Sequence, residues 1–286
     1  MTRAAAAVDN RPVPRLDHVM VLLDAETHRA VEETGFLAER LGRIKVKKAD
    51  SSVAGQYSTL GIAGRSTLVE LFGAEMPGSA PLSGGLVFSF EEPGSSPDAR
   101  ALLDATGTVR HHHDLVRRVV EGHEEPQPWY HLINVDLGAG NPLLLFLNEV
   151  TPEYFASLGA VAEPDGAMRR AAYLDAVLGH PADPASLLRD ISGVTLLVGA
   201  DRAAALAAAL APFGWVPTEG AGGTELVGPG LTIGLRVGDW PRERVAEIRL
   251  DLEPGAWTDD VPAELVFGPS SRLVFTGPTA ATWHFA

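Results

Sequence analysis

The sequence predicts an α+β protein made of repeated βαβββ units. Three observations carry this prediction. Residues 16–73 show a strand-like run, a helix-like segment and three further strand-like segments, in that order. The same order returns across residues 84–150, and it begins a third time at residue 191. Self-similarity at about 60 residues indicates duplicated structural units, because it exceeds the periods of solenoid repeats.

The first unit opens with residues 16–23, LDHVMVLL, an apolar and partly β-branched run typical of a strand. Residues 24–42 predict a helix, because Asp24 and Thr27 form a plausible start and Gly42 a natural stop. Apolar residues recur at helical spacing between them. Three strands are expected to follow, at residues 43–52, 55–64 and 66–73.

The second unit repeats this order. A strand is expected at 84–92, and a short helix at 95–107 begins with Ser, Pro and Asp. Three strands then follow at 108–120, 128–137 and 141–150. The first of them is ambiguous, since its apolar residues could equally lie on one face of a helix.

Residues 151–188 interrupt the repeat with two helix-like segments and a Pro-rich stretch, HPADPAS, so we place a domain boundary there. A third unit follows, with a strand at 191–199, an alanine-rich helix at 200–215 and a strand pair at 223–238. The remainder has strands but no clear helix, as in a truncated fourth unit. The expected organisation is a flexible tail at 1–14, a two-unit domain at 15–150, a helical linker at 151–188 and a second, ligand-poor domain at 189–286. In each unit the helix would cover one face of a sheet, and the other face could curl around a cavity.

Composition argues against some classes of binding partner. The net charge is −14, with 37 acidic residues against 23 Lys and Arg. Such a surface repels nucleic acid and anionic membranes. No apolar stretch approaches 18 residues and the first residues do not form a signal peptide, so a cytoplasmic protein is expected. There is no cysteine, so a metal site would need His, Asp or Glu.

The βαβββ unit, its duplication and the opening LDHVMVLLD resemble the vicinal oxygen chelate superfamily, which includes glyoxalase I, extradiol dioxygenases and antibiotic-resistance proteins. The segments STLVELFG and NPLLLFLNEVTPEYF more narrowly resemble a glyoxalase-like family of uncharacterised function. The resemblance covers residues 15–175 well and residues 190–286 by pattern only. It implies two βαβββ units that form a U-shaped sheet around a divalent metal.

The superfamily's ligands lie on the first and last strand of each unit. In the first unit the resemblance places them at His18 and Glu70. The third unit carries Gly193 and Gly234 at the matching positions, so we expect its domain to keep the scaffold without the ligands.

In the second unit the first-strand position falls on Gly85, which cannot ligate, and the last-strand position falls on Leu145 or Phe146. Glu149 is the nearest acidic residue, three or four positions further on. His131, on the strand before, could replace the missing ligand, although the sequence does not say which face of its strand looks into the cavity.

Each candidate also has a plainer interpretation. His18 could be a hydrogen-bonded core histidine, and Glu70 could face solvent on an alternating strand. Glu149 could be an exposed acid at a strand end, and His131 a hydrogen-bonding cavity or surface residue. The run RHHHD at 110–114 is not expected to bind metal, because adjacent strand residues point to opposite faces.

We therefore expect an enzyme that binds one divalent metal, Fe, Mn, Ni or Zn, through His18, Glu70 and Glu149. The metal would act as a Lewis acid on a small, oxygen-rich organic metabolite, with Glu149 or His131 moving a proton. The reaction would be an isomerase, lyase, hydrolytic or oxygenase step. The alternative is a metal-free protein of the same fold that binds a small molecule or sequesters an antibiotic. A monomer or a homodimer is compatible with either.

Overall fold

The computed structural model describes residues 11–51, 55–73, 82–119, 124–179, 186–220 and 222–286, with the backbone alone for 47–51 and 55–58. Most of the expected tail and of the Pro-rich linker, residues 1–10 and 180–185, lie outside the described residues. The α-helices and strands of the first two units are β1 (Arg15–Leu23), α1 (Ala25–Glu32), β2 (Arg43–Ser51), β3 (Gly55–Ala63), β4 (Leu68–Gly73), β5 (Gly84–Phe90), α2 (Ser95–Ala105), β6 (His111–Arg118), β7 (Gln127–Val135) and β8 (Leu143–Val150).

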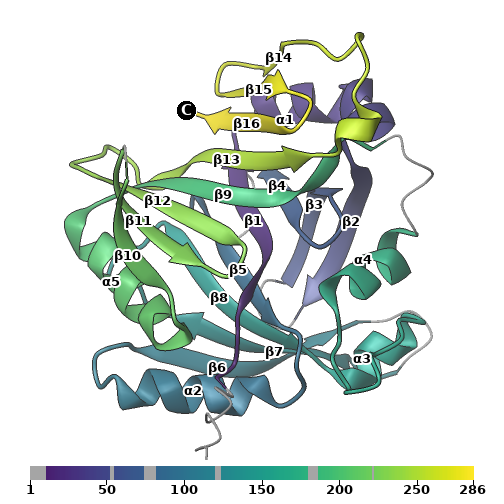
Figure 1. The fold of residues 1–286 in the computed structure, drawn as a ribbon. Helices are drawn as coiled ribbons and strands as arrows, with labels where there is room; N and C mark the ends of the chain where they lie inside the picture. The colour runs from purple at the N-terminus through teal and green to yellow at the C-terminus, as the bar shows by residue number, and fades with distance from the viewer. Residues whose placement is uncertain (1–10, 52–54, 74–81, 120–123, 180–185, 221) are drawn as a thin grey trace, which may run out of the picture.

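The first eight strands form a closed barrel in the order β1-β4-β3-β2-β6-β7-β8-β5 (Figure 1). Each unit pairs its first strand parallel to its last, β1 with β4 and β5 with β8. The two units meet along β1 and β5, which are antiparallel from Arg15 to Val21. Opposite this junction, the described pairing of β2 with β6 is limited to Ser51 and Arg118. The expected U-shaped sheet is therefore closed at its open side by a short seam.

A second sheet of eight strands has the order β10-β11-β12-β9-β13-β16-β15-β14. Its elements are β9 (Leu188–Val198), α5 (Ala200–Leu210), β10 (Val216–Gly220), β11 (Gly223–Gly228), β12 (Leu231–Val237), β13 (Arg244–Leu252), β14 (Glu264–Phe267), β15 (Ser271–Gly277) and β16 (Ala280–Phe285). A short 3-10 turn, Pro254–Ala256, stands where the fourth unit would have its helix. The predicted α+β class with repeated βαβββ units in two curled sheets is confirmed.

Local signals explain where the helices begin. Asp24 caps α1, since its side chain accepts the Thr27 backbone N–H at 2.9 Å. The single helix predicted over 24–42 is instead α1 followed by a π-helical turn, Leu37–Leu41. The ambiguous segment at 108–120 contains strand β6, because its pairing with β7 outweighs the helical spacing. Residues 151–179 contain α3 (Pro152–Ser157) and α4 (Arg170–Leu178). Among the described residues, no helix is long and apolar enough to cross a bilayer.

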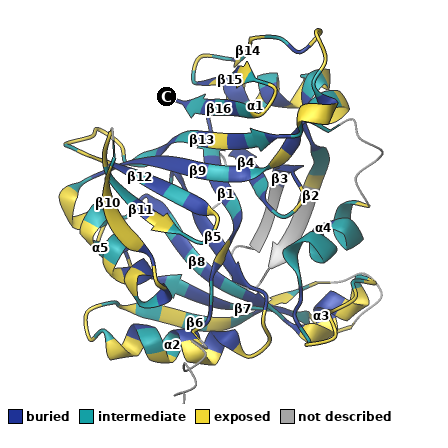
Figure 2. Cartoon of the chain, viewed as in Figure 1, coloured by how far each residue is buried: buried dark blue, intermediate teal, exposed yellow. Residues whose placement is uncertain are grey.

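One large core lies between the barrel and the second sheet. On the barrel side this core contains Val19 and Val21, which point outward from β1. On the side of the second sheet it contains Val194 and Leu196 of β9. Figure 2 shows these strands as largely buried, with exposed residues on β10, on helices such as α2 and on the connecting loops. A separate apolar cluster, centred on Met20, lies inside the barrel. Strand β1 thus has one face in the shared core and the other in the barrel interior.

Candidate functional site

Strand β1 directs His18 into the barrel. Side chains alternate along a strand, so His18 shares a face with Met20, whose neighbours Phe72 and Val87 complete the interior cluster. A bulge lies between Leu16 and His18 where β1 pairs with β5. A bulge disturbs the strict alternation of faces, which allows Asp17 to turn its carboxylate toward its neighbour His18.

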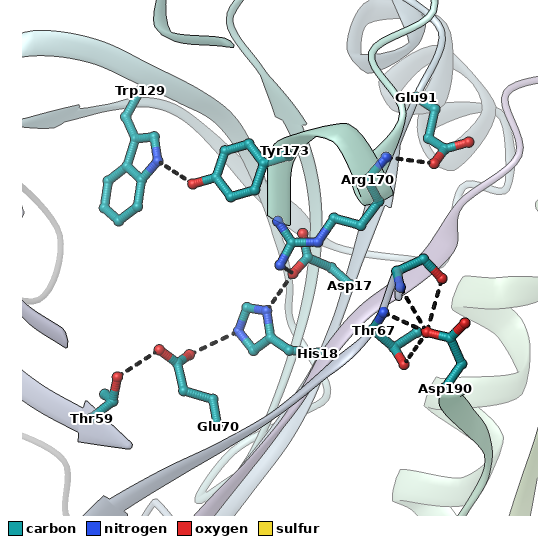
Figure 3. A network of polar contacts seen from close by, with 11 residues as sticks. Asp17, His18, Thr59, Thr67, Glu70, Glu91, Trp129, Arg170, Tyr173 and Asp190 are labelled. Carbon is teal, nitrogen blue, oxygen red and sulfur yellow. Dashed lines mark hydrogen bonds and ion pairs between the residues drawn. The ribbon is translucent and has the colours of Figure 1, made fainter. Parts of the chain in front are cut away.

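Four side chains on the barrel wall form a continuous polar chain (Figure 3). Asp17 Oδ1 lies 2.7 Å from His18 Nδ1, and Glu70 Oε2 lies 3.1 Å from His18 Nε2. The Thr59 hydroxyl donates to Glu70 Oε1 at 2.8 Å. At the other end, Arg170 Nη2 of helix α4 lies 2.6 Å from Asp17 Oδ1. Cations and carboxylates therefore alternate along the chain, which is the arrangement that tolerates burial.

Electrostatics fix the protonation of this chain. Burial lowers the pKa of His18, but the Glu70 and Asp17 carboxylates raise it by more, to about 9. Burial raises the pKa of Asp17, but Arg170 and His18 outweigh it, so that pKa lies below its ordinary value. His18 is therefore an imidazolium at neutral pH, and both of its ring N–H groups donate to carboxylates.

The structure does not bring Glu149 to the His18–Glu70 pair. Its two carboxylate oxygens accept backbone N–H groups of Gly94 and Ser96, both at 2.6 Å, at the start of α2. This is a favourable place for a carboxylate, because the first N–H groups of a helix have no partner within it. Glu149 therefore lies on the outer face of β8 and caps a helix.

His131 lies on the same outer face, because it is the direct cross-strand partner of Glu149. Its ring stacks on His113 with centroids 5.6 Å apart, and His113 in turn lies 3.3 Å from Arg100 of α2. His111 also points toward α2, where it approaches Asp104. The histidine run thus splits between the two faces of β6, as expected for a strand.

In the second unit, the two positions where the resemblance would place metal ligands carry no side chain that can bind a metal. The pairing of β5 with β8 sets Gly85 beside Leu144, as that of β1 with β4 sets His18 beside Leu68. The counterpart of Glu70 is then Phe146, which packs in the barrel interior. Gly85 is required by packing, since a Cβ there would come within 2.6 Å of the Leu144 carbonyl oxygen.

The second sheet has glycines at the positions of His18 and Glu70. Gly193 pairs with Thr232, and Gly234 follows two residues later on β12, in the same register as in the first unit. A Cβ at Gly193 would collide with the Arg249 guanidinium, which occupies the space above it.

The same face of the second sheet carries polar residues that the sequence reasoning missed. The Thr195 hydroxyl donates to Glu247 Oε2 at 3.1 Å, and Glu247 Oε1 lies 3.5 Å from His284 Nδ1. Arg236 Nη2 also donates to Glu247, at 3.0 Å. These residues are more exposed than the chain in the barrel.

The structure brings together two of the three predicted metal ligands, His18 and Glu70, and places Glu149 elsewhere. Within the described residues, no group of three or more His, Asp or Glu side chains is placed to hold an ion. His18 and Glu70 are two donors, whereas a catalytic zinc site has three protein ligands.

Three members of the polar chain were missed from the sequence: Asp17, Thr59 and Arg170. Asp17 directly precedes His18, and strict strand alternation would place the two side chains on opposite faces of β1. The bulge between Leu16 and His18 removes this alternation and lets the Asp17 carboxylate reach His18. Arg170 comes from a helix more than 150 residues away in sequence, and no local pattern signals that contact.

The chain belongs to a family of unknown function, DUF5829, whose model matches residues 16–285. Among curated proteins, none matches the chain.

Solved structures provide more distant likenesses. A hypothetical protein from Staphylococcus aureus is 13% identical with a TM-score of 0.50, covering 81% of this chain and 88% of its own. A xylose isomerase-like TIM barrel/4-hydroxyphenylpyruvate dioxygenase fusion protein is 14% identical with a TM-score of 0.47, covering 83% of this chain. The match spans 36% of that fusion protein's length. Methylmalonyl-CoA epimerase from Mycobacterium tuberculosis is 14% identical with a TM-score of 0.33, covering 52% of this chain and 96% of its own. At these identities the comparison with the staphylococcal protein establishes the fold alone.

Proposed function

We propose that this member of the family is a metal-free small-molecule-binding protein, and that the interior of its first barrel is the binding site. The observation that carries the proposal is the burial pattern of β8. Its outward side chains Leu143, Leu145 and Leu147 are buried, whereas its inward side chains Leu144 and Phe146 retain accessible surface. Side chains that face the inside of a closed barrel and remain accessible indicate space that the protein does not fill.

The lining defines the kind of ligand. Met20, Phe72, Val87, Leu144 and Phe146 form an apolar wall on one side. The polar chain through His18 and Glu70 adds a group of fixed charges. Mostly apolar sites with a few placed polar groups bind compact organic molecules. This supports the metal-free alternative that the sequence left open.

The metal-dependent enzyme of the vicinal oxygen chelate superfamily is the second candidate, because one observation favours it. Asp17 holds His18 Nδ1 as an outer carboxylate holds a metal-ligating histidine, and leaves Nε2 directed at Glu70. In that case His18 and Glu70 would supply the protein donors, and a bound metal would supply Lewis-acid chemistry.

Binding of the neutral fluorophore N-phenyl-1-naphthylamine tests the first candidate. We expect saturable one-to-one binding, weakened at least about tenfold by Leu144→Trp, which fills the barrel interior. Val266→Trp, at an exposed site on the second sheet, is the matched control and should bind as the wild type does. Absence of saturable binding, or binding that Leu144→Trp leaves unchanged, would overturn the proposal.

Elemental analysis of the purified protein separates the two candidates. The metal-free protein should carry no stoichiometric Fe, Mn, Ni or Zn. A full equivalent of one metal that is lost in His18→Ala would favour the second candidate instead.

A further inference from the structure

Helix α4 fixes the position of Arg170 at the end of the barrel. The Arg170 backbone N–H donates to Glu91 Oε1 at 2.8 Å, at the end of β5. One turn on, the Tyr173 hydroxyl accepts from Trp129 Nε1 of β7 at 3.4 Å. Asp175 lies 2.6 Å from Arg43 of β2. The helix is thus tied to strands of both units, and Figure 3 shows the Arg170 side chain extending toward His18.

The Arg170 guanidinium has more donors than the structure uses. Its side chain is 10% exposed, Nη2 pairs with Asp17, and its Cζ atom lies over the Tyr173 ring, 4.7 Å from the ring centroid. Its Nε atom is buried and meets no hydrogen-bond acceptor among the described residues. A buried unpaired donor costs about 1–3 kcal/mol, so such atoms in folded proteins call for an explanation.

A second unpaired atom belongs to the same barrel. Asn148 Oδ1 on β8 is buried and has no hydrogen-bond donor among the described residues. The strand pairings place Asn148 beside Ser89, and Ser89 beside Arg15, two residues before Asp17. An unsatisfied donor and an unsatisfied acceptor therefore accompany the polar chain.

We propose that the ligand of the first barrel is a small organic acid whose carboxylate binds Arg170. The inference rests on the proposed function and specifies its ligand class. A planar guanidinium whose Nε–H has no partner among the described residues matches a carboxylate, which can accept that N–H together with one from a neighbouring Nη atom. Asp17 does not exclude this second anion, because the cations His18 and Arg170 flank it. The apolar body of the acid would lie against the wall around Phe72 and Phe146.

Displacement of N-phenyl-1-naphthylamine by two matched competitors tests the inference. 1-Naphthoate carries a carboxylate, and 1-naphthamide has nearly the same shape without the charge. In the wild type we expect naphthoate to bind at least about tenfold more tightly, as for a charge-assisted hydrogen bond. In Arg170→Gln the affinities for naphthoate and naphthamide should agree within about twofold, and this ratio is the readout whatever the variant's affinity for the neutral fluorophore. Arg170→Lys keeps the charge without the planar fork, and should retain part of the preference.

Arg169→Gln is the control, because Arg169 precedes α4 and pairs with Glu91 and Glu92 instead of Asp17. It should keep the full preference for naphthoate. An equal preference for naphthoate in the wild type and in Arg170→Gln would overturn the inference about Arg170, without contradicting the proposal that the barrel interior binds a small molecule. Failure of the fluorophore to bind would overturn both proposals.

Discussion

Each of the two sheets carries a threonine, a glutamate and a histidine linked in that order. In the barrel they are Thr59, Glu70 and His18, and in the second sheet Thr195, Glu247 and His284. The His18 and Glu70 side chains are 17% and 8% exposed, whereas those of His284 and Glu247 are 31% and 21% exposed. The same residue types therefore form a more enclosed charge network in the barrel and a more exposed one on the second sheet. The comparison shows that the enclosing barrel, more than the residue set, makes the first network a candidate site.

The largest expected difference follows from removing the glutamate charge. Glu70→Gln should lower the free energy of unfolding by about 3–5 kcal/mol, because it leaves a buried imidazolium without one of its two anions. Glu247→Gln should change it by less than about 1 kcal/mol, since water screens that network. Urea unfolding of both variants at pH 7 measures the contrast. Equal losses would show that enclosure does not distinguish the two networks.

The pH dependence of stability comes next in size. The pKa of His18 is raised from 6.5 to about 9 by folding, so its stabilisation is complete below pH 6.5. It is lost as the pH rises through 9, and it amounts to something on the order of 3 kcal/mol. Asp17 does not contribute in this window, because its lowered pKa affects stability only in acid. Unfolding measured from pH 6 to 10 should show the decline, and Glu70→Gln should flatten it. A flat wild-type profile would argue against an imidazolium at His18.

Gly85 and Gly193 stand at the positions equivalent to His18 in the second and third units, and substituting them should give a smaller difference in stability. Gly85→Ala should cost about 2–3 kcal/mol, because the new Cβ meets the backbone of Leu144, which cannot move without disturbing the strand pairing. Gly193→Ala should cost less than about 1 kcal/mol, because the Arg249 guanidinium is the end of a long side chain that can swing aside. Thermal denaturation of the two variants checks this. A large loss in Gly193→Ala would mean that Arg249 is held rigidly on the sheet.

The threonines should give the smallest effect. Thr59→Val removes a hydrogen bond to a buried carboxylate, and we expect a loss of about 1–2 kcal/mol. Thr195→Val should lose about 0.5 kcal/mol, because water can replace its hydroxyl at the more exposed Glu247. Chemical denaturation can resolve the two values. The reverse order would indicate that the barrel interior already supplies Glu70 with another donor of equal strength.

Much of the fold could be predicted from the sequence, because strand and helix periodicity is a local property. The resemblance also placed His18 and Glu70 on two strands expected to lie side by side, and in the structure β1 and β4 pair with each other. The prediction for Glu149 was limited by the alternation of strand faces. One residue decides whether a side chain points to the barrel or to helix α2, and the apolar run before Glu149 does not reveal which.

Contacts that depend on tertiary structure were beyond local reasoning. The bulge at Asp17 arises from pairing with β5, and Arg170 reaches the site only because α4 folds back onto the barrel. The bulge recurs at the matching position of β9, between Ile191 and Gly193, so it belongs to the repeating unit but becomes visible only once the strands are paired. The contact from Arg170 comes from outside the repeating unit, so the repeat could not predict it.

The two faces of β1 have a consequence for how the molecule unfolds. Val19 and Val21 are held by the core shared with β9, while His18 and Met20, between and beside them, line the barrel interior. The barrel and the second sheet should therefore behave as one cooperative unit, with a single transition in calorimetry. A ligand bound in the barrel would then stabilise both sheets against heat, because the second sheet unfolds in the same transition as the barrel.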